Sequence, residues 1–184
     1  MAGDVEAPRP RMALAGVLLA ACAVAVAVGV YGRGHGHRRP VFVVGFSGVI
    51  QFKVWLATAA LVLVLVQVIT ALWMWGRLPR AGSAPGWVGP VHRWTGAIAF
   101  VVLIPVALNC LLTFGFESTS ARVVLHSIAG CTFYGAYAAK MLGLRLRGLP
   151  GWTLPVLGGT VFASLVVLWL TSAVWFFGLN QPLT

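Results

Sequence analysis

Two polar side chains in neighbouring apolar runs, Asn109 and His126, are the residues of this sequence best suited to chemistry. They flank a short polar turn centred on Ser118, with Asn109 nine residues before it and His126 eight residues after it. If both runs are antiparallel helices, equal distance from the turn means equal depth along the helix axes. The spacing therefore predicts that the two side chains face each other within a helix pair.

A histidine at that depth favours the ligation of haem iron. Membrane cytochromes of the b type hold haem between histidines on neighbouring helices, so His126 is a candidate axial ligand and metal-binding residue. Asn109 is a candidate to line the same site, although an amide is a poor ligand for haem iron. The alternative is a cofactor-free pair in which the Asn109 amide hydrogen-bonds to His126, a bond worth about 0.6–2 kcal/mol between membrane helices.

His92 and Arg93 stand at the far end of the run that contains Asn109. His92 could ligate a second haem there, with the Arg93 guanidinium paired with a haem propionate. No other histidine lies at that depth, so a site with two histidines cannot be assembled at this end. The alternative is a helix end anchored at the membrane interface by His92, Arg93 and Trp94. His35 and His37 lie in a loop without further ligands nearby, and we expect them to be solvated.

The residue types missing from the apolar runs argue against several classes of function. Asp and Glu occur three times in all, and none lies in an apolar run. Proton-coupled transport relies on carboxylates inside the membrane, and hydrolysis relies on an acid–base pair. The three cysteines lie in apolar runs without CxxC spacing, which argues against a disulfide framework. If the protein is an enzyme at all, we expect an electron-transfer component rather than a hydrolase or transferase.

The composition predicts an all-α integral membrane bundle. Hydrophobic residues make up 60% of the 184 residues and charged residues 9%, whereas about a quarter of a soluble domain is charged. We expect one transmembrane domain over residues 1–184, with an interfacial loop at 32–51. Five runs are long enough to cross a hydrocarbon core about 30 Å thick, at residues 12–31, 53–75, 93–114, 121–144 and 154–177. The first run is longer than the apolar region of a signal peptide, about 7–15 residues, so we interpret it as a transmembrane helix.

The net charge of +10 is scattered between the apolar runs and does not form one basic face. This pattern is typical of loop charges that contact lipid head groups and orient helices, and it argues against nucleic-acid binding. More arginine lies on the side of the N-terminus, which predicts a multi-pass protein of the cell membrane with a cytoplasmic N-terminus. Gly130 and Gly135 in the fourth run, and Gly158 and Gly159 in the fifth, are small residues suited to close helix packing.

Four stretches, residues 45–79, 91–100, 121–142 and 149–177, resemble a family of small uncharacterised membrane proteins found mainly in actinobacteria. The helical layout is more loosely similar to the cytochrome b561 and ferric-reductase-like membrane cytochromes, which pass electrons through haem b. The resemblance implies histidine at the positions of His92 and His126. It also implies a histidine within residues 104–110, where this sequence has Asn109.

Two hypotheses follow from these observations. In the first, the protein is a small membrane subunit associated with respiratory or redox electron transfer, holds haem b at His126, and has other subunits of a redox complex as partners. In the second, it is a cofactor-free accessory subunit that binds a larger membrane complex through its small-residue helix faces. A transporter of small molecules is less favoured, because few polar residues are available to line a cavity.

Overall fold

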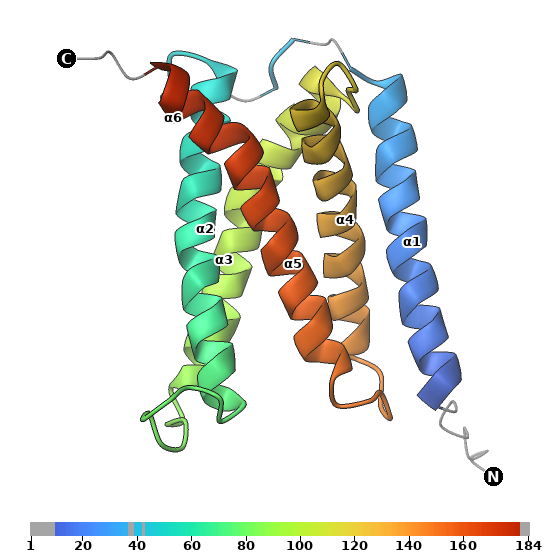
Figure 1. The fold of residues 1–184 in the computed structure, drawn as a ribbon, viewed down its shortest axis with the longest axis vertical. Coiled ribbons are helices and arrows are strands. Elements are labelled where there is room, and N and C mark those ends of the chain that lie inside the picture. Colours follow the sequence, from blue (N-terminus) through green and yellow to red (C-terminus); the bar gives the residue numbers. More distant parts are fainter. Residues whose placement is uncertain (1–9, 37–38, 42, 181–184) are drawn as a thin grey trace.

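The computed structural model describes residues 10–36, 39–41 and 43–180, and every regular element in these ranges is helical. Two of the helices contain a π-helical turn: η1 continues α3, and η2 joins α5 to α6. The long helices run alternately in opposite directions (Figure 1). The elements are α1 (Pro10–Gly34), α2 (Val49–Met74), α3 (Val88–Asn109), η1 (Cys110–Phe114), α4 (Ala121–Gly143), α5 (Thr153–Trp169), η2 (Leu170–Val174) and α6 (Trp175–Asn180).

Four helical segments of the described chain are long and apolar enough to cross a membrane. Helix α4 is not one of these four. The four segments are Arg11–Gly34, Val49–Met74, Val88–Phe114 and Thr153–Gly178. Helix α4 has 23 residues but is less apolar, so the fifth crossing stays a prediction. It packs against α1 and against α5, and its position between them (Figure 1) means that less of its surface faces lipid. This position explains how α4 can carry more polar residues than its neighbours.

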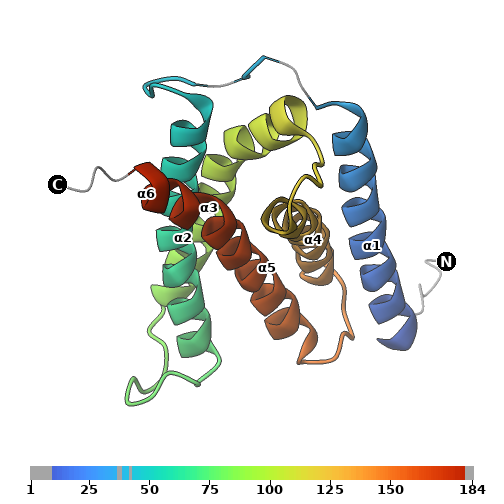
Figure 2. The same cartoon turned by 45° about the horizontal axis from the view of Figure 1, so that its top comes forward.

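The long helices form two groups, α2 with α3, and α1 with α4 and α5; α5 also contacts α2. The prediction that the third and fourth helices pack directly against each other is wrong. Within the described ranges α3 packs on α2, and α4 packs on α1 and α5; Figure 2 shows α3 and α4 joined by their turn but set apart. Large side chains fill part of the space between them, since the rings of Phe100 and Tyr137 stack with centroids 4.5 Å apart.

Two buried clusters hold the groups together. In the first, Ala60, Leu103, Phe133 and Leu165 bring α2, α3, α4 and α5 into one core. The second joins α1, α4 and α5 through Val17, Ala139 and Leu157. Helix α4 contributes to both clusters and so links α1 to the rest of the bundle.

Helix α4 approaches α1 closely at Gly135. A Cβ atom added to Gly135 would lie 2.5 Å from the backbone oxygen of Ala21 and 3.0 Å from the Cβ of Ala25. The prediction of close packing at this small residue is confirmed. Within this chain Gly158 and Gly159 make no such contact, because a Cβ added to either would meet nothing within 4 Å; their packing against another protein stays a prediction.

The turn between η1 and α4 is fastened to the end of α1. Gly115 has a φ of 72°, and a Cβ added there would lie 2.6 Å from the backbone oxygen of Gly32, so glycine is required for both its conformation and its size. The next residue, Phe116, donates its backbone N–H to the same oxygen at 3.0 Å. Helix α4 then begins with Ser120, whose hydroxyl accepts from the Val123 N–H.

The connection between α1 and α2 is shorter than the interfacial loop expected at 32–51. Helix α1 extends to Gly34 and α2 begins at Val49, and the described residues between them are irregular. The His35 ring stacks on Tyr31 with centroids 4.0 Å apart, and its Nδ1 lies 2.8 Å from the Tyr31 oxygen. The expectation of a solvated His37 lies outside the described residues.

Candidate functional site

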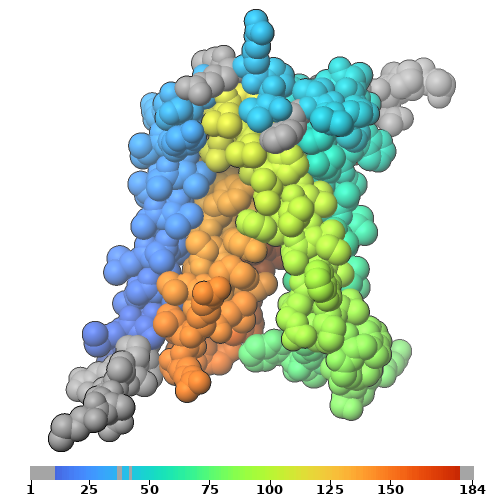
Figure 3. Space-filling model, turned by 180° about the vertical axis from the view of Figure 1, so that it is seen from behind, coloured from blue at the N-terminus to red at the C-terminus, as the bar shows by residue number. Residues whose placement is uncertain are grey.

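A cavity lies between the two helix groups, in the half of the bundle nearest the turn before α4. About 830 Å³ of atom-free space lies here, a figure that includes space open to the outside and is therefore not an enclosed volume. All five long helices contribute to its lining, and most of that lining is apolar. At the opposite end of the bundle the groups diverge, and Figure 3 shows a hollow between the lower parts of α3 and α4.

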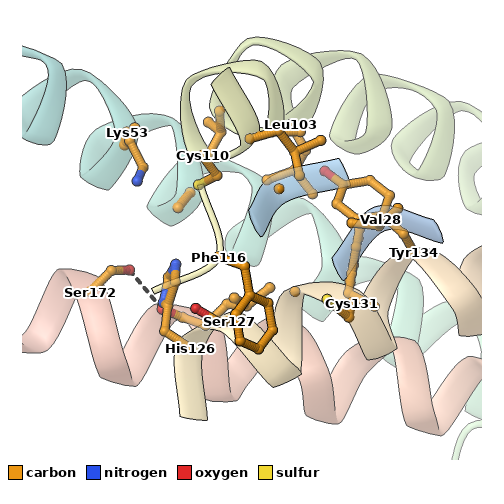
Figure 4. A pocket seen from close by; sticks show the side chains of 18 of the residues that line it. Val28, Lys53, Leu103, Cys110, Phe116, His126, Ser127, Cys131, Tyr134 and Ser172 are labelled. Carbon is orange, nitrogen blue, oxygen red and sulfur yellow. Dashed lines mark hydrogen bonds between the residues drawn. The ribbon is translucent and has the colours of Figure 1, made fainter. Parts of the chain in front are cut away.

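The polar groups of the cavity gather on one side. Figure 4 shows Lys53, His126 and Ser172 together at one side of the pocket, and Val28 and Tyr134 at the other. Lys53 is the fifth residue of α2 and His126 the sixth of α4, and both helices begin at the same end of the bundle (Figure 1). At about 1.5 Å per residue, both lie within about 10 Å of their helix ends. The polar side of the cavity is therefore close to one membrane surface.

His126 is oriented by a hydrogen bond to α5. Its Nδ1 lies 2.9 Å from the hydroxyl oxygen of Thr171. That hydroxyl has one hydrogen, which it donates to the backbone oxygen of Val167 at 2.7 Å. When the hydrogen is used in this way, the Thr171 oxygen can accept from an Nδ1–H of His126, a tautomer in which the lone pair lies on Nε2. A fixed Nδ1–H with a free Nε2 is the arrangement by which proteins prepare a histidine to bind a metal.

Arg122, one turn before His126 in α4, also binds Thr171. Its Nη1 donates to the backbone oxygen of Thr171 at 2.6 Å, and its guanidinium lies 4.3 Å from the centre of the Trp175 ring. Arg122 and His126 are four residues apart and so share one face of α4. Together they bind the backbone oxygen and the hydroxyl of Thr171, which lies in the π-helical turn η2. Such π-helical turns are often found at functional sites. Sequence reasoning missed Arg122 and Thr171 as parts of the site, although the four-residue spacing of Arg122 and His126 could have indicated a shared role.

Asn109 and His126 do not form the expected pair. Asn109 is fully buried, but its Oδ1 accepts from the backbone N–H of Val41 at 3.0 Å and lies 3.4 Å from the Thr113 hydroxyl. His126 is bonded to Thr171 instead, and Asn109 is not among the residues that line the cavity. The prediction of an Asn109–His126 hydrogen bond is therefore wrong. Asn109 holds the connection between α1 and α2 against the end of α3.

Replacing Asn109 by leucine is expected to destabilise the protein by about 1–3 kcal/mol, because the Val41 N–H loses its acceptor. Thr113→Val is the matched control, since it removes the 3.4 Å contact but leaves the bond to Val41. Thermal unfolding in detergent measures both variants. Equal melting temperatures for Asn109→Leu and the wild type would contradict the anchoring role.

His92 and Arg93 lie at the opposite end of the bundle from His126 (Figure 1). His92 Nδ1 lies 2.9 Å from the Thr70 hydroxyl, and Gln67 donates to the His92 backbone oxygen and to the Thr95 hydroxyl at 2.9 Å. The Arg93 side chain is exposed. The structure thus gives His92 a polar setting between α2 and α3, apart from the cavity, and a second haem at His92 and Arg93 stays a prediction.

Conventional metal sites need several protein ligands close together. Within residues 10–36, 39–41 and 43–180, no group of three or more His, Cys, Asp or Glu side chains could hold a metal ion. Haem iron makes a smaller demand, because the porphyrin supplies four nitrogens and the protein one or two axial ligands. A single histidine that lines an apolar cavity could supply one such ligand.

The comparisons with known proteins give a family but no relative of known activity. No curated protein and no solved structure matches this chain. A family model matches residues 13–182, a range that begins inside α1 and ends beyond α6. The family relationship therefore covers the whole helical bundle, including His126, Thr171 and Lys53. The chain belongs to a family of unknown function, DUF6529.

Proposed function

We propose that this protein is a small integral membrane subunit of a respiratory or redox electron-transfer system, and that it holds haem b in the central cavity with His126 as an axial ligand. One observation carries the proposal: Thr171 holds the Nδ1 side of the His126 ring, and His126 is one of the residues that line the cavity. The helical layout predicted from the sequence loosely resembles that of the cytochrome b561 proteins, and this resemblance also suggests haem b. Partner subunits of a redox complex would supply and accept the electrons.

Most of the remaining lining residues are apolar, and an apolar lining suits the ring of a haem. Gly130 leaves space at the cavity wall, since a Cβ added there would meet only the Leu168 side chain, at 3.9 Å. Haem, when bound, supplies reversible one-electron transfer at its iron. The apolar walls would limit the access of water to a bound haem, and Thr171 would keep the His126 ring in one orientation.

The direct test is a reduced-minus-oxidised absorption spectrum of the intact protein, purified in detergent after expression with a haem supply. We expect a Soret band and an α band that follow the protein through gel filtration. A folded, monodisperse protein without either band would remove the haem proposal.

The cofactor-free accessory subunit is the second candidate, and one observation favours it. Gly159 and Ala163 are exposed and one turn apart on α5, so they offer a small-residue face to another helix. The face of α4 that contains Gly135 already packs against α1. This face is therefore not available for packing against a partner subunit. A protein that purifies without haem and only together with other membrane subunits would favour it; a stable haem-free monomer would contradict both candidates.

We also propose a cell-membrane location with the start of α1 on the cytoplasmic side. Among the described residues, six arginines lie towards that end of the bundle: Arg11, Arg77, Arg80, Arg93, Arg145 and Arg147. Four basic residues lie towards the other: Arg33, Arg39, Lys53 and Arg122. Since cytoplasmic loops carry the excess of Lys and Arg, this bias favours the orientation given.

Reporter fusions are expected to show this orientation. Alkaline phosphatase joined after α6 should be active, because that end faces outward, whereas the same enzyme inserted between α2 and α3 should be inactive. Green fluorescent protein at the same two positions should give the opposite pattern and serves as the control. Active phosphatase between α2 and α3 would show that the bundle is inverted.

A further inference from the structure

We infer that the central cavity binds a ligand that combines an apolar body with a carboxylate, and that Lys53 is the counter-charge for that carboxylate. The inference rests in part on the proposed function, because the propionates of haem are such carboxylates. A fatty acid carries the same group on an apolar chain. The shared chemistry is therefore an amphipathic acid, and the experiment below separates the two sources.

The first support is the lack of an acidic partner for Lys53. Lys53 lines the cavity and is partly buried. Its Nζ lies 4.1 Å from the centre of the Phe114 ring, and no carboxylate in the described part of the chain pairs with it. A partly buried ammonium loses hydration, and a cation–π contact with phenylalanine replaces only part of that loss. An anion brought by a ligand would complete the pairing.

The second support is the charge around the polar side of the cavity. His126 and Arg122 bind the two polar groups of Thr171, which places a second permanent cation near the same end of the site. Glu117, the one acidic residue among those described, accepts through its backbone oxygen from Ser127 at 3.1 Å and is not among the lining residues. This side of the cavity is therefore electropositive and favours a negatively charged ligand group.

The third support is the division of the cavity into a polar and an apolar side. Lys53 and Ser172 lie on the polar side, and Val28, Leu103 and Tyr134 lie away from them (Figure 4). Since Lys53 is close to the start of α2, a carboxylate bound to it would lie near the membrane surface. The apolar body would extend between α3 and α4. A neutral apolar ligand would use the walls but not the ammonium.

Titrations of the purified haem-free protein with three probes test the inference. The probes are haemin, haemin dimethyl ester, which lacks free carboxylates, and a fluorescent fatty acid. We expect Lys53→Gln to weaken binding of haemin and of the fatty acid by about tenfold or more, and to leave binding of the ester unchanged. Lys53→Arg should retain wild-type binding because it keeps the charge. Lys140→Gln removes a lysine that is not among the cavity-lining residues, and it should have no effect.

The outcomes separate this inference from the proposed function. Haemin binding that needs both Lys53 and His126 supports both. Fatty-acid binding that needs Lys53, without any haem spectrum that depends on His126, supports the inference and removes the haem proposal. Equal binding of each acid to the wild type and to Lys53→Gln overturns the inference, whether or not His126 holds haem. Failure of the folded wild type to bind either acid overturns it as well.

Discussion

Replacing His126 by alanine is expected to abolish the haem spectrum of the purified protein, whereas replacing His92 by alanine should leave it unchanged. His126 lines the cavity, and Thr171 holds the Nδ1 side of its ring. His92 lies at the other end of the bundle, bonded to Thr70. If one imidazole supplies the bond to iron, its loss removes that ligand.

Graded variants test whether the role of His126 is ligation. Thr171→Val keeps the volume of the side chain but removes the acceptor for Nδ1–H, and we expect it to weaken haem binding by about 10–100-fold, as for other partners of metal-binding histidines. Thr171→Ser should remain close to the wild type because it keeps the hydroxyl. Imidazole added to His126→Ala should restore part of the spectrum. Circular dichroism and gel filtration establish that each variant is folded; a full Soret band in folded His126→Ala would show that another group holds the iron.

The course of the helices could be predicted from the sequence because length and apolarity decide it. Each apolar run must bury its backbone hydrogen bonds within a helix once it enters the membrane, so long runs between polar turns mark the helices. The start of α4 at Ala121 follows from Ser120, a good N-cap residue at the end of a polar turn. The end of α1 was harder to predict, because Gly32 and Gly34 resemble helix ends, yet Gly32 bonds to Phe116 and the helix continues.

The partner of His126 could not be predicted by the same reasoning. Equal distance from a turn gives equal depth, but it does not give the direction in which a side chain points around its helix. That direction changes by about 100° per residue, and the π-helical turn η1 begins at Cys110, directly after Asn109. The large rings of Phe100 and Tyr137 also stand between the two helices. Asn109 therefore contacts the connection after α1, while His126 contacts α5.

The residues that orient His126 are far from it in the sequence. Thr171 is 45 residues from His126 and 49 from Arg122, and one threonine in an apolar run gives no local sign of its partners. The cavity depends on all five long helices, so its existence is a property of the helix arrangement rather than of any motif. Lys53 could be recognised from sequence as a charge near a helix end, but its place at the cavity could not.

Replacing Gly135 by valine is expected to destabilise the bundle by about 1–3 kcal/mol or more, since added volume at a tight contact forces side chains and backbone to move. The first added carbon would lie 2.5 Å from the backbone oxygen of Ala21, and a backbone oxygen cannot rotate away as a flexible side chain does. Helix α1 must therefore move away from α4. Because α1 contributes Val28 and Gly32 to the cavity wall, the same displacement should weaken ligand binding.

A matched pair of variants separates this contact from a general effect of valine in a membrane helix. Gly158→Val places the same side chain on α5, where an added Cβ meets nothing within 4 Å, and we expect its stability to remain close to that of the wild type. Gly135→Ala adds only the first carbon and should fall between Gly135→Val and the wild type. Unfolding by increasing fractions of denaturing detergent measures stability, and haemin titration reports on the cavity. If Gly135→Val and Gly158→Val were equally stable, the close approach of α1 and α4 would not contribute to the stability of the bundle.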